Sequence, residues 1–372
     1  MTKTYDLIVI GGGTAGNGVA RMAAEAGWSV ASIDSEPHGG TCALRGCDPK
    51  KMLVAVTEGV EWAENMEGKG LEAQPSVNWP DMIAFKRSFT DNMPPRIEGG
   101  MEKARIDVLH GEARFTGSDT IELNGETLTA KHFHIATGAR PMTLNIPGEE
   151  YLATSTDFLG LPERPDRIAF VGGGFIAMEF AHVAKRAGAR EVTVLEMMDR
   201  PLGNFDPDLV ATLVRASEAI GIRVHVKTAM EAVEKKGGRF VVHASREGKK
   251  LKLETELVVH GAGRVPEIEG LDLEKAGIGY SRKGISVNEY LQSVSNPAAY
   301  AAGDAAATGG LPLTPVASME GRVVAANLLN ENHQKPNYVG VPSVVFTVPP
   351  LASVGLQEAA ARERGLRIKI NH

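Results

Sequence analysis

The chain has 372 residues, a length that predicts two or three domains. Apolar residues make up 43% and charged residues 23% of the chain, which is ordinary for a globular protein and argues against a disordered one. The net charge of −6 comes without a basic block, so nucleic acid and anionic membranes are disfavoured as partners and small molecules are favoured.

The N-terminal residues lead directly into a strand-like run at 7–10, without the pattern of a secretion signal. No later segment approaches the 18 consecutive apolar residues that would predict a membrane span. We therefore expect a cytoplasmic protein. Cys42 and Cys47 are its two cysteines. In the cytoplasm such a close pair is more often catalytic than structural.

Residues 5–34 predict a β-α-β unit: an apolar strand (YDLIVI), a glycine-rich turn, a helix to Ala26, a stop at Gly27 and a second strand (SVASID). In this context the backbone N–H groups of the turn can bind a pyrophosphate at the helix N-terminus, and Asp34 can accept hydrogen bonds from a ribose. The residues that we expect to bind a first dinucleotide here are Gly11, Gly13, Thr14, Ala15, Gly16 and Asp34.

Residues 50–103 are polar and compatible with helices, and short strands are expected around HGEARF, TIELNG and FHIATG. Proline-containing loops between 141 and 165 predict a domain boundary.

The same β-α-β pattern returns at residues 167–196, with the turn Gly172-x-Gly174-x-x-Ala177. Glu196 ends its second strand, so a second dinucleotide is expected. A carboxylate there repels a 2′-phosphate and favours NADH over NADPH, although Arg200 could reach such a phosphate.

Further strands are expected in RVHV, RFVVHA and ELVVHGAGR, with the charged run REGKKLK as a solvated hairpin tip. The segment SVVFTVPPLASVG, beyond residue 337, begins another β-like region.

The spacing of the cysteines constrains their backbone. A disulfide needs Cα atoms about 4.4–6.8 Å apart, which positions i and i+5 of a regular helix do not offer, so the segment must be irregular and Gly46 permits this. Gly39 and Gly40 allow a large ligand to approach closely, and a helix beginning near Thr41 would lower a thiol pKa. A zinc site is disfavoured because two cysteines without a histidine pair cannot fill four positions, and no metal site is expected; an inert buried pair stays open.

The segment GGTCALRGCDPKK resembles the GGTCxNxGCxPxK signature of the class I pyridine nucleotide-disulfide oxidoreductases, which include glutathione, dihydrolipoamide, mycothione and mercuric reductases. The resemblance covers essentially the whole chain. Its further motifs are GxGxxG at Gly11, IATG at 135–138, GGGFIAMEFA at 172–181, GAGRVP at 261–266 and YAAGDAA at 300–306.

This resemblance implies an α/β fold with two Rossmann-like three-layer domains and the start of an α+β interface domain. FAD would bind the first unit and NAD(P)H the second. Electrons would pass from nicotinamide through FAD to a Cys42–Cys47 disulfide and then to a small disulfide, or in reverse from a dithiol.

The resemblance also implies roles for single residues. Cys47 would be the sulfur next to the flavin, and Cys42 would attack the substrate. Lys51 would lie near the flavin and pair with Glu179, and Asp304 would bind the ribitol. Further cofactor-binding positions carried over by motif are Gly40, Thr41, Ala113, Thr137, Gly138, Ile176, Gly263, Gly303 and Thr314.

The implied domains are residues 1–155 and 286–336 for FAD, 156–285 for NAD(P) and 337–372 for the start of the interface domain. Family members continue into that domain, which supplies homodimer contacts and a His-Glu pair in an HPT-type motif. None of the ten histidines here precedes a proline, so that motif is absent from the sequence. The sequence is then either a piece of a longer protein or a natural short form without full turnover, and we favour the piece because SVVFTVPPLASVG would otherwise leave unpaired strand edges. Arg45 and Asp48 put charges beside the cysteines. These charges either shift a thiol pKa or the substrate preference, or pair with each other, and we favour the pair.

Three hypotheses about activity follow. The leading one is a reductase of low-molecular-weight disulfides or a dihydrolipoamide-type dehydrogenase. The alternatives are a mercuric-reductase-like metal-ion reductase and a diaphorase-like flavoprotein without disulfide turnover. A thioredoxin-reductase-like arrangement is disfavoured because its cysteines have CxxC spacing within the nucleotide domain.

Overall fold

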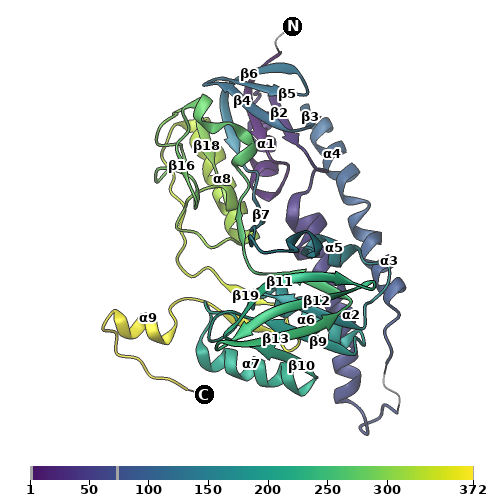
Figure 1. Ribbon diagram of the computed structural model, residues 1–372. Helices are drawn as coiled ribbons and strands as arrows, with labels where there is room; N and C mark the ends of the chain where they lie inside the picture. The colour runs from purple at the N-terminus through teal and green to yellow at the C-terminus, as the bar shows by residue number, and fades with distance from the viewer. Residues whose placement is uncertain (1–2, 73–74, 372) are drawn as a thin grey trace. The chain divides into compact units, whose positions relative to one another are not determined.

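The structure is a computed structural model that describes residues 3–72 and 75–371 (Figure 1). The chain divides into two compact units, and each is made of three segments. The first unit contains Met1–Asp48, Phe89–Arg140 and Arg264–Val339, and the second contains Pro49–Ser88, Pro141–Gly263 and Gly340–His372. The functional domains with boundaries at 155, 285 and 336 stay a prediction.

The first unit is built on a seven-stranded sheet in the order β3-β2-β1-β6-β5-β4, with β18 also paired to β6. β3, β2, β1, β6 and β18 run parallel, while β5 is antiparallel to β6 and to β4. The strands of this sheet are β1 (Lys3–Ile10), β2 (Val30–Asp34), β3 (Ile106–His110), β4 (Ala113–Gly117), β5 (Thr120–Leu123), β6 (Glu126–Ile135) and β18 (Ala299–Ala301).

Helices of the first unit cover one face of this sheet. Because successive strand residues point to opposite faces, Leu7 and Val9 pack with the helices α1 (Thr14–Glu25) and α8 (Thr314–Asn330), and Ile8 and Ile10 pack on the other side. α1 and α8 lie side by side (Figure 1). The remaining regular elements here are α4 (Met93–Lys103), β7 (Ala139–Pro141), β15 (Arg264–Pro266), β16 (Tyr280–Ser281) and β17 (Gly284–Ile285).

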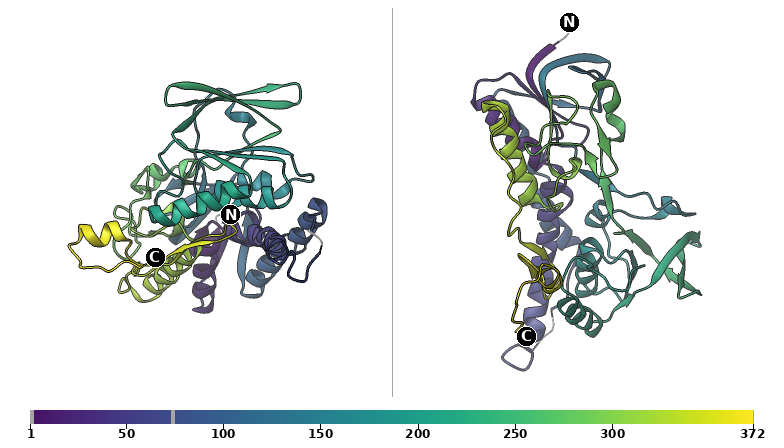
Figure 2. Two further views of the ribbon diagram at one scale, coloured as in Figure 1. Left: turned by 90° about the horizontal axis from the view of Figure 1, so that it is seen from below. Right: turned by 90° about the vertical axis from the view of Figure 1, so that its left-hand side faces the viewer.

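The second unit repeats the design with a parallel sheet in the order β10-β9-β8-β14. Ile168 and Phe170 face a core with α6, whereas Ala169 and Val171 face a core with the antiparallel sheet β11-β12-β13. Figure 2 shows the long strands of that antiparallel sheet. The bounds are β8 (Arg167–Val171), α6 (Phe175–Arg186), β9 (Glu191–Leu195), β10 (Ile222–His225), β11 (Thr228–Lys236), β12 (Arg239–Arg246), β13 (Lys249–Thr255) and β14 (Leu257–His260).

Five more helices and one hairpin complete the second unit. α2 begins in the first unit and α3 ends in it, and both lie mostly in the second. Their bounds are α2 (Cys47–Asn65), α3 (Trp79–Thr90), α5 (Ser155–Gly160), α7 (Pro207–Ala219) and α9 (Glu358–Glu363), with the hairpin of β19 (Ser343–Val345) and β20 (Leu351–Ser353).

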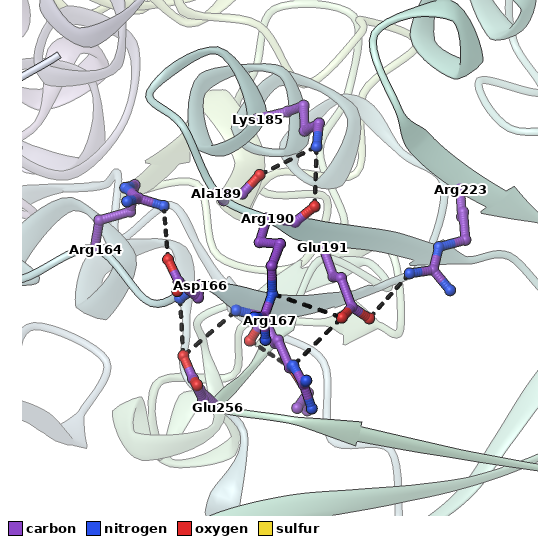
Figure 3. Close-up of polar contacts among 10 residues, drawn as sticks. Arg164, Asp166, Arg167, Lys185, Ala189, Arg190, Glu191, Arg223 and Glu256 are labelled. Carbon is purple, nitrogen blue, oxygen red and sulfur yellow. Dashed lines mark hydrogen bonds and ion pairs between the residues drawn. The ribbon is translucent and has the colours of Figure 1, made fainter. Parts of the chain in front are cut away.

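A charged network lies at the amino ends of β8 and β9 (Figure 3). Glu191 accepts contacts from Arg167, Arg190 and Arg223 at 3.4, 3.8 and 3.0 Å. These residues lie at the sheet edge opposite the glycine-rich turn that follows β8. The network is therefore not at the carboxyl edge, which is where open parallel sheets usually bind their ligands.

The predicted fold class is confirmed, and both β-α-β units form where the sequence predicts them. The charged run becomes the tip of the β12-β13 hairpin, where Glu247 and Gly248 both have positive φ. No helix in the described part of the chain is long and apolar enough to cross a membrane.

Candidate functional site

The first glycine-rich turn connects β1 to α1 at the carboxyl edge of the sheet. Gly11 has φ +111°, and a Cβ there would lie 2.2 Å from the carbonyl oxygen of Ala136. A Cβ on Gly16 would lie 2.0 Å from the carbonyl oxygen of Gly11, so α1 packs directly against the turn. Gly13 precedes Thr14 at the helix N-terminus, and no side chain caps that end. Free backbone donors at a helix N-terminus are a site for an anion such as a pyrophosphate.

Asp34 closes the other side of this turn. Its carboxylate accepts the N–H of Gly12 at 2.7 Å and that of Glu36 at 2.9 Å. Its carbonyl oxygen accepts the N–H of Gly111 at 3.0 Å, two residues before the buried Ala113. The predicted ribose-binding carboxylate is therefore held at the first turn, as its motif requires.

Two more strand ends meet the same edge, because β6 and β18 run parallel to β1. Thr137 and Gly138 follow β6, and Gly138 has φ +76°. Gly303 follows β18, and a Cβ on it would lie 3.4 Å from the Cβ of Ala15 on α1. The predicted residues Asp34, Thr137, Gly138 and Gly303 therefore lie near one edge of this sheet.

Asp304 is half-buried in a charged environment. Burial raises the pKa of its carboxyl, and the Arg264 guanidinium opposes this rise. Burial lowers the pKa of Arg264, which donates a hydrogen bond to the carbonyl oxygen of Ala139. The sequence contained Arg264 within the GAGRVP motif, but its link to Asp304 is visible only in the fold.

Glu320 is a supporting residue that the sequence analysis missed. It is 1% exposed and accepts hydrogen bonds from the Gly303 N–H at 2.7 Å, the Thr308 hydroxyl at 2.8 Å and the Tyr338 hydroxyl at 2.7 Å. It fixes the turn that carries Asp304. Its position in the middle of an ordinary helical sequence gave no signal of this.

The cysteines lie on an irregular turn, as their spacing predicts. Thr41–Arg45 forms a π-helical turn, Gly46 interrupts it at φ −151° and ψ −104°, and α2 begins at Cys47. A Cβ on Gly40, which has φ +63°, would lie 2.6 Å from the Cα of Gly13. The start of the turn that carries the cysteines therefore packs directly against the first glycine-rich turn.

The two sulfurs interact with each other and with α8. Both cysteines are half-buried thiols, and Cys42 is hydrogen-bonded with Cys47. The Sγ of Cys47 lies 3.2 Å from the hydroxyl oxygen of Thr314, the first residue of α8. Thr314 therefore contacts Cys47 with its side chain, and its cofactor-binding role stays a prediction.

The expectation of a lowered thiol pKa is wrong for Cys42. Its hydrogen bond with Cys47 and its burial raise the pKa of this thiol well above the ordinary range, while the Thr314 hydroxyl acts in the opposite direction. The negative charge of Asp48 adds to the rise. A five-residue π-helical turn does not outweigh a sulfur neighbour and a carboxylate.

The expected pair of Arg45 with Asp48 is also corrected. Arg45 donates a hydrogen bond to the carboxylate of Glu36 at 3.1 Å. Because Arg45 ends the π-helical turn and Asp48 lies beyond the break at Gly46, the two charges are on different segments.

The second glycine-rich turn, between β8 and α6, repeats the design of the first. Gly172 has φ +90° and Gly174 precedes α6 without a side-chain cap, two residues before Ile176. Glu196 is buried and accepts the N–H groups of Gly173 and Met198.

Two further residues were expected at this second site. Gly263 has φ +113° and follows the end of β14 at the same carboxyl edge. The guanidinium of Arg200 donates to the backbone carbonyls of Phe205 at 2.7 Å and Gly203 at 2.8 Å. Arg200 therefore stabilises its own loop.

The lysine that donates to Glu179 is Lys50, where the resemblance pointed to Lys51. Lys50 Nζ lies 2.6 Å from Glu179 Oε2, and both side chains are buried. Lys51 is exposed and its Nζ lies 4.9 Å from the ring centre of Phe346. Adjacent residues of a helix point about 100° apart, and the register of α2 turns position 50 toward α6.

The residues of the first unit fit the expected FAD. Thr137 Oγ1 and Asn17 Oδ1 are buried side-chain oxygens without a hydrogen-bond partner in the described residues. Buried polar atoms are normally satisfied, so these two are available to a polar ligand. Together with Asp34 and the uncapped helix N-terminus, they offer donors and acceptors for a large dinucleotide.

Comparison with known proteins agrees with this geometry. A family model described as pyridine nucleotide-disulphide oxidoreductase matches residues 5–321. A glutathione reductase of Burkholderia cepacia is 35% identical over 368 residues, which cover 98% of this chain and 80% of that protein. A dihydrolipoyl dehydrogenase of Thermus scotoductus is 36% identical over 374 residues, which cover 99% and 80%.

Two further similarities extend this result. A mercuric reductase of Staphylococcus aureus is 35% identical over 371 residues, which cover 98% of this chain and 67% of that protein. The solved structure of a Cu(II) complex of the HOCl-induced flavoprotein disulfide reductase RclA from Escherichia coli superposes with a TM-score of 0.87 at 28% identity, covering 98% and 80%. The chain therefore belongs to the pyridine nucleotide-disulphide oxidoreductase family, which implies FAD and a pyridine nucleotide as its cofactors.

Proposed function

We propose that this protein reduces a small disulfide, or oxidises the corresponding dithiol, by cycling Cys42 and Cys47 between disulfide and dithiol. The observation that carries the proposal is the contact of the two cysteines on a turn that packs against the first dinucleotide site. When bound, FAD relays two electrons between the nicotinamide and the cysteine pair.

The thiol–disulfide exchange at the cysteines balances in bonds broken and formed, and NADH supplies the two electrons that restore the dithiol. In the direction of reduction, the Cys42 thiolate attacks the substrate disulfide, forms a mixed disulfide and releases one substrate thiolate. Cys47 then attacks the Sγ of Cys42, which releases the second thiolate and restores the Cys42–Cys47 disulfide. NADH supplies the two electrons for the next cycle, and solvent protons convert the released thiolates to thiols.

The contacts of the two cysteines suit these unequal roles. Cys47 lies against Thr314 at the N-terminus of α8, a place that favours a thiolate. Because the hydrogen bond with Cys47 raises the pKa of Cys42, the attack by Cys42 needs a base that accepts its proton. We expect this base to come from a partner subunit in a homodimer.

We infer that NADH is the preferred coenzyme. Glu196 puts a buried carboxylate at the expected ribose position, where it would repel a 2′-phosphate. Arg200 is engaged by two backbone carbonyls, which supports the absence of a phosphate-binding role. The cofactor-binding roles of the other motif residues are part of the same proposal, except that of Lys51, which is exposed and whose predicted partner Glu179 is bound by Lys50.

The test uses FAD-loaded protein with Cys47→Ser and Cys42→Ser as a matched pair. With the flavin oxidised and the remaining cysteine present as a free thiol, Cys42→Ser should show a long-wavelength charge-transfer band between the Cys47 thiolate and the flavin, and Cys47→Ser should lack it. Both variants should lose turnover with oxidised glutathione, lipoamide and mycothione, measured with NADH and NADPH in parallel. Turnover that survives in Cys47→Ser would refute the proposal, and reduction of Hg(II) alone would favour a metal-ion reductase.

A further inference from the structure

A cluster of two histidines and one glutamate lies in the first unit and contains neither cysteine, although His38 stands four residues before Cys42. His38 lies on the loop after β2, Glu98 lies on α4, and His110 is the last residue of β3. One ligand atom from each of the three lies within 4.8 Å of the other two. Glu98 Oε1 is central, at 3.6 Å from His38 Nδ1 and 3.4 Å from His110 Nε2.

His38 is oriented for use as a ligand. Its side chain is 0% exposed, and Nε2 lies 3.2 Å from the hydroxyl oxygen of buried Ser32. Nδ1, which faces Glu98, has no hydrogen-bond partner in the described part of the chain. When Nε2 donates to Ser32, the lone pair of Nδ1 is directed into the cluster, and such an outer hydrogen bond is typical of metal-binding histidines.

The spacing of the three atoms suits a small divalent cation. Bonds of about 2.0–2.2 Å at tetrahedral angles put two ligand atoms roughly 3.3–3.6 Å apart. Both distances from Glu98 lie close to this range.

An ion pair between Glu98 and His110 alone accounts for fewer of these contacts than a bound cation does. The contact of Glu98 with the half-exposed His110 alone would be an ordinary surface pair, worth about 0–1 kcal/mol. It would leave the buried Nδ1 of His38 with only the 3.6 Å contact to Glu98 and without a hydrogen bond in the described residues, at a cost that native interiors normally avoid. A cation bound by all three side chains satisfies that atom.

We propose that His38, Glu98 and His110 form a binding site for one divalent transition-metal ion of the Zn²⁺ type, with water completing its coordination. The three donors belong to separate elements of the fold, so no local sequence pattern connects them. For this reason the sequence alone predicted no metal site. The site adjoins the first dinucleotide turn, because a Cβ on Gly12 would lie 2.5 Å from the His38 ring. A bound cation would thus tie α4 and the end of β3 to that turn.

The experiment must separate this site from the thiols, which also bind soft metals. It therefore uses tag-free, FAD-loaded full chain carrying Cys42→Ser and Cys47→Ser. The protein is equilibrated with Zn²⁺ and gel-filtered. Its metal content is measured by mass spectrometry, and the Zn²⁺ affinity by competition with a chromogenic chelator. We expect one Zn²⁺ per chain and a Zn²⁺-dependent rise in Tm.

Substitutions on the exposed side of the cluster avoid the folding risk of changing buried His38. Glu98→Gln and His110→Ala should each weaken Zn²⁺ binding by about ten-fold or more. Glu102→Gln, which changes an exposed glutamate of the same helix, and His333→Ala, which removes an exposed histidine, should leave it unchanged. No stoichiometric Zn²⁺ in the parent, or equal affinity in Glu98→Gln and His110→Ala, would overturn the proposal. Neither result depends on disulfide turnover.

Discussion

Glu179 is a carboxylate with only 1% of its side chain exposed, and a buried charge of this kind requires a partner. Lys50 provides the cation, and the backbone N–H of Phe346 donates to the second oxygen at 2.8 Å. The two lysines of the motif are therefore in different environments. Both ammonium groups lie near the ring centre of Phe346, at 4.8 Å for Lys50 and 4.9 Å for Lys51, but Lys50 is buried in the ion pair while Lys51 is exposed.

Lys50→Met should destabilise the second unit by about 3–5 kcal/mol, because it leaves the Glu179 carboxylate buried without this cation. The neighbouring change Lys51→Met should alter stability by no more than about 0.5 kcal/mol. Urea unfolding followed by circular dichroism measures both. The double variant Lys50→Met/Glu179→Gln should recover most of the loss, since no charge is then buried. Equal effects of the two lysine variants would contradict the assigned pair.

The residue scale is where the sequence predicted least. Position 51 matched the motif, but the rotation of about 100° per residue along α2 decides which lysine reaches Glu179. The cluster of His38, Glu98 and His110 was equally hidden, because β2, β3 and α4 bring together residues that no local pattern connects.

At the scale of single elements, glycine-rich turns were predicted well because their chemistry is local. A turn that packs backbone against backbone has no room for a Cβ, and the sequence shows this directly as glycine. The irregular turn at Thr41–Arg45 was also predictable from the cysteine spacing. The effect of that turn on Cys42 was not, because it depends on a sulfur neighbour and on Thr314.

Gly40→Ala should disrupt the first dinucleotide site. The residue has φ +63° and its new Cβ would lie 2.6 Å from the Cα of Gly13, so we expect a loss of about 1–3 kcal/mol and poor retention of FAD on gel filtration. Gly18→Ala is the matched control. Gly18 lies within α1 with nothing within 4 Å of an added Cβ, and alanine there should stabilise by about 0.5–1 kcal/mol. Normal FAD retention in Gly40→Ala would show that the turn does not shape the site.

At the scale of the whole molecule, each unit contains a sheet whose central strands run parallel, with a glycine-rich turn and a strand-end carboxylate at their carboxyl ends. The repeated sequence pattern predicted this duplication. Which segments make up each compact unit was less predictable. Residues 49–88 belong to the second unit, although they directly follow the turn that carries the cysteines, which lies in the first unit.

Stability should decrease on mild acidification. Burial lowers the pKa of His134 in the first unit and of His182 in the second to about 4. Since an unfolded histidine binds a proton near pH 6.5, the unfolded state takes up more protons between these values. Stability is therefore fully present above about pH 6.5 and is lost as the pH falls toward 4, by roughly 2–3 kcal/mol per histidine. Urea unfolding at pH 7 and pH 5 checks this, and equal stability at both would contradict it.

The most direct measurement is a thiol count on the FAD-loaded chain, which has only two cysteines. Oxidised protein is mixed anaerobically with one equivalent of NADH, unfolded, and titrated with a thiol reagent. The account predicts no reactive thiols before NADH and two per chain afterwards, with Cys47→Ser unable to show this gain. A thiol count that NADH does not change, while the flavin is reduced, would contradict a redox-active Cys42–Cys47 pair.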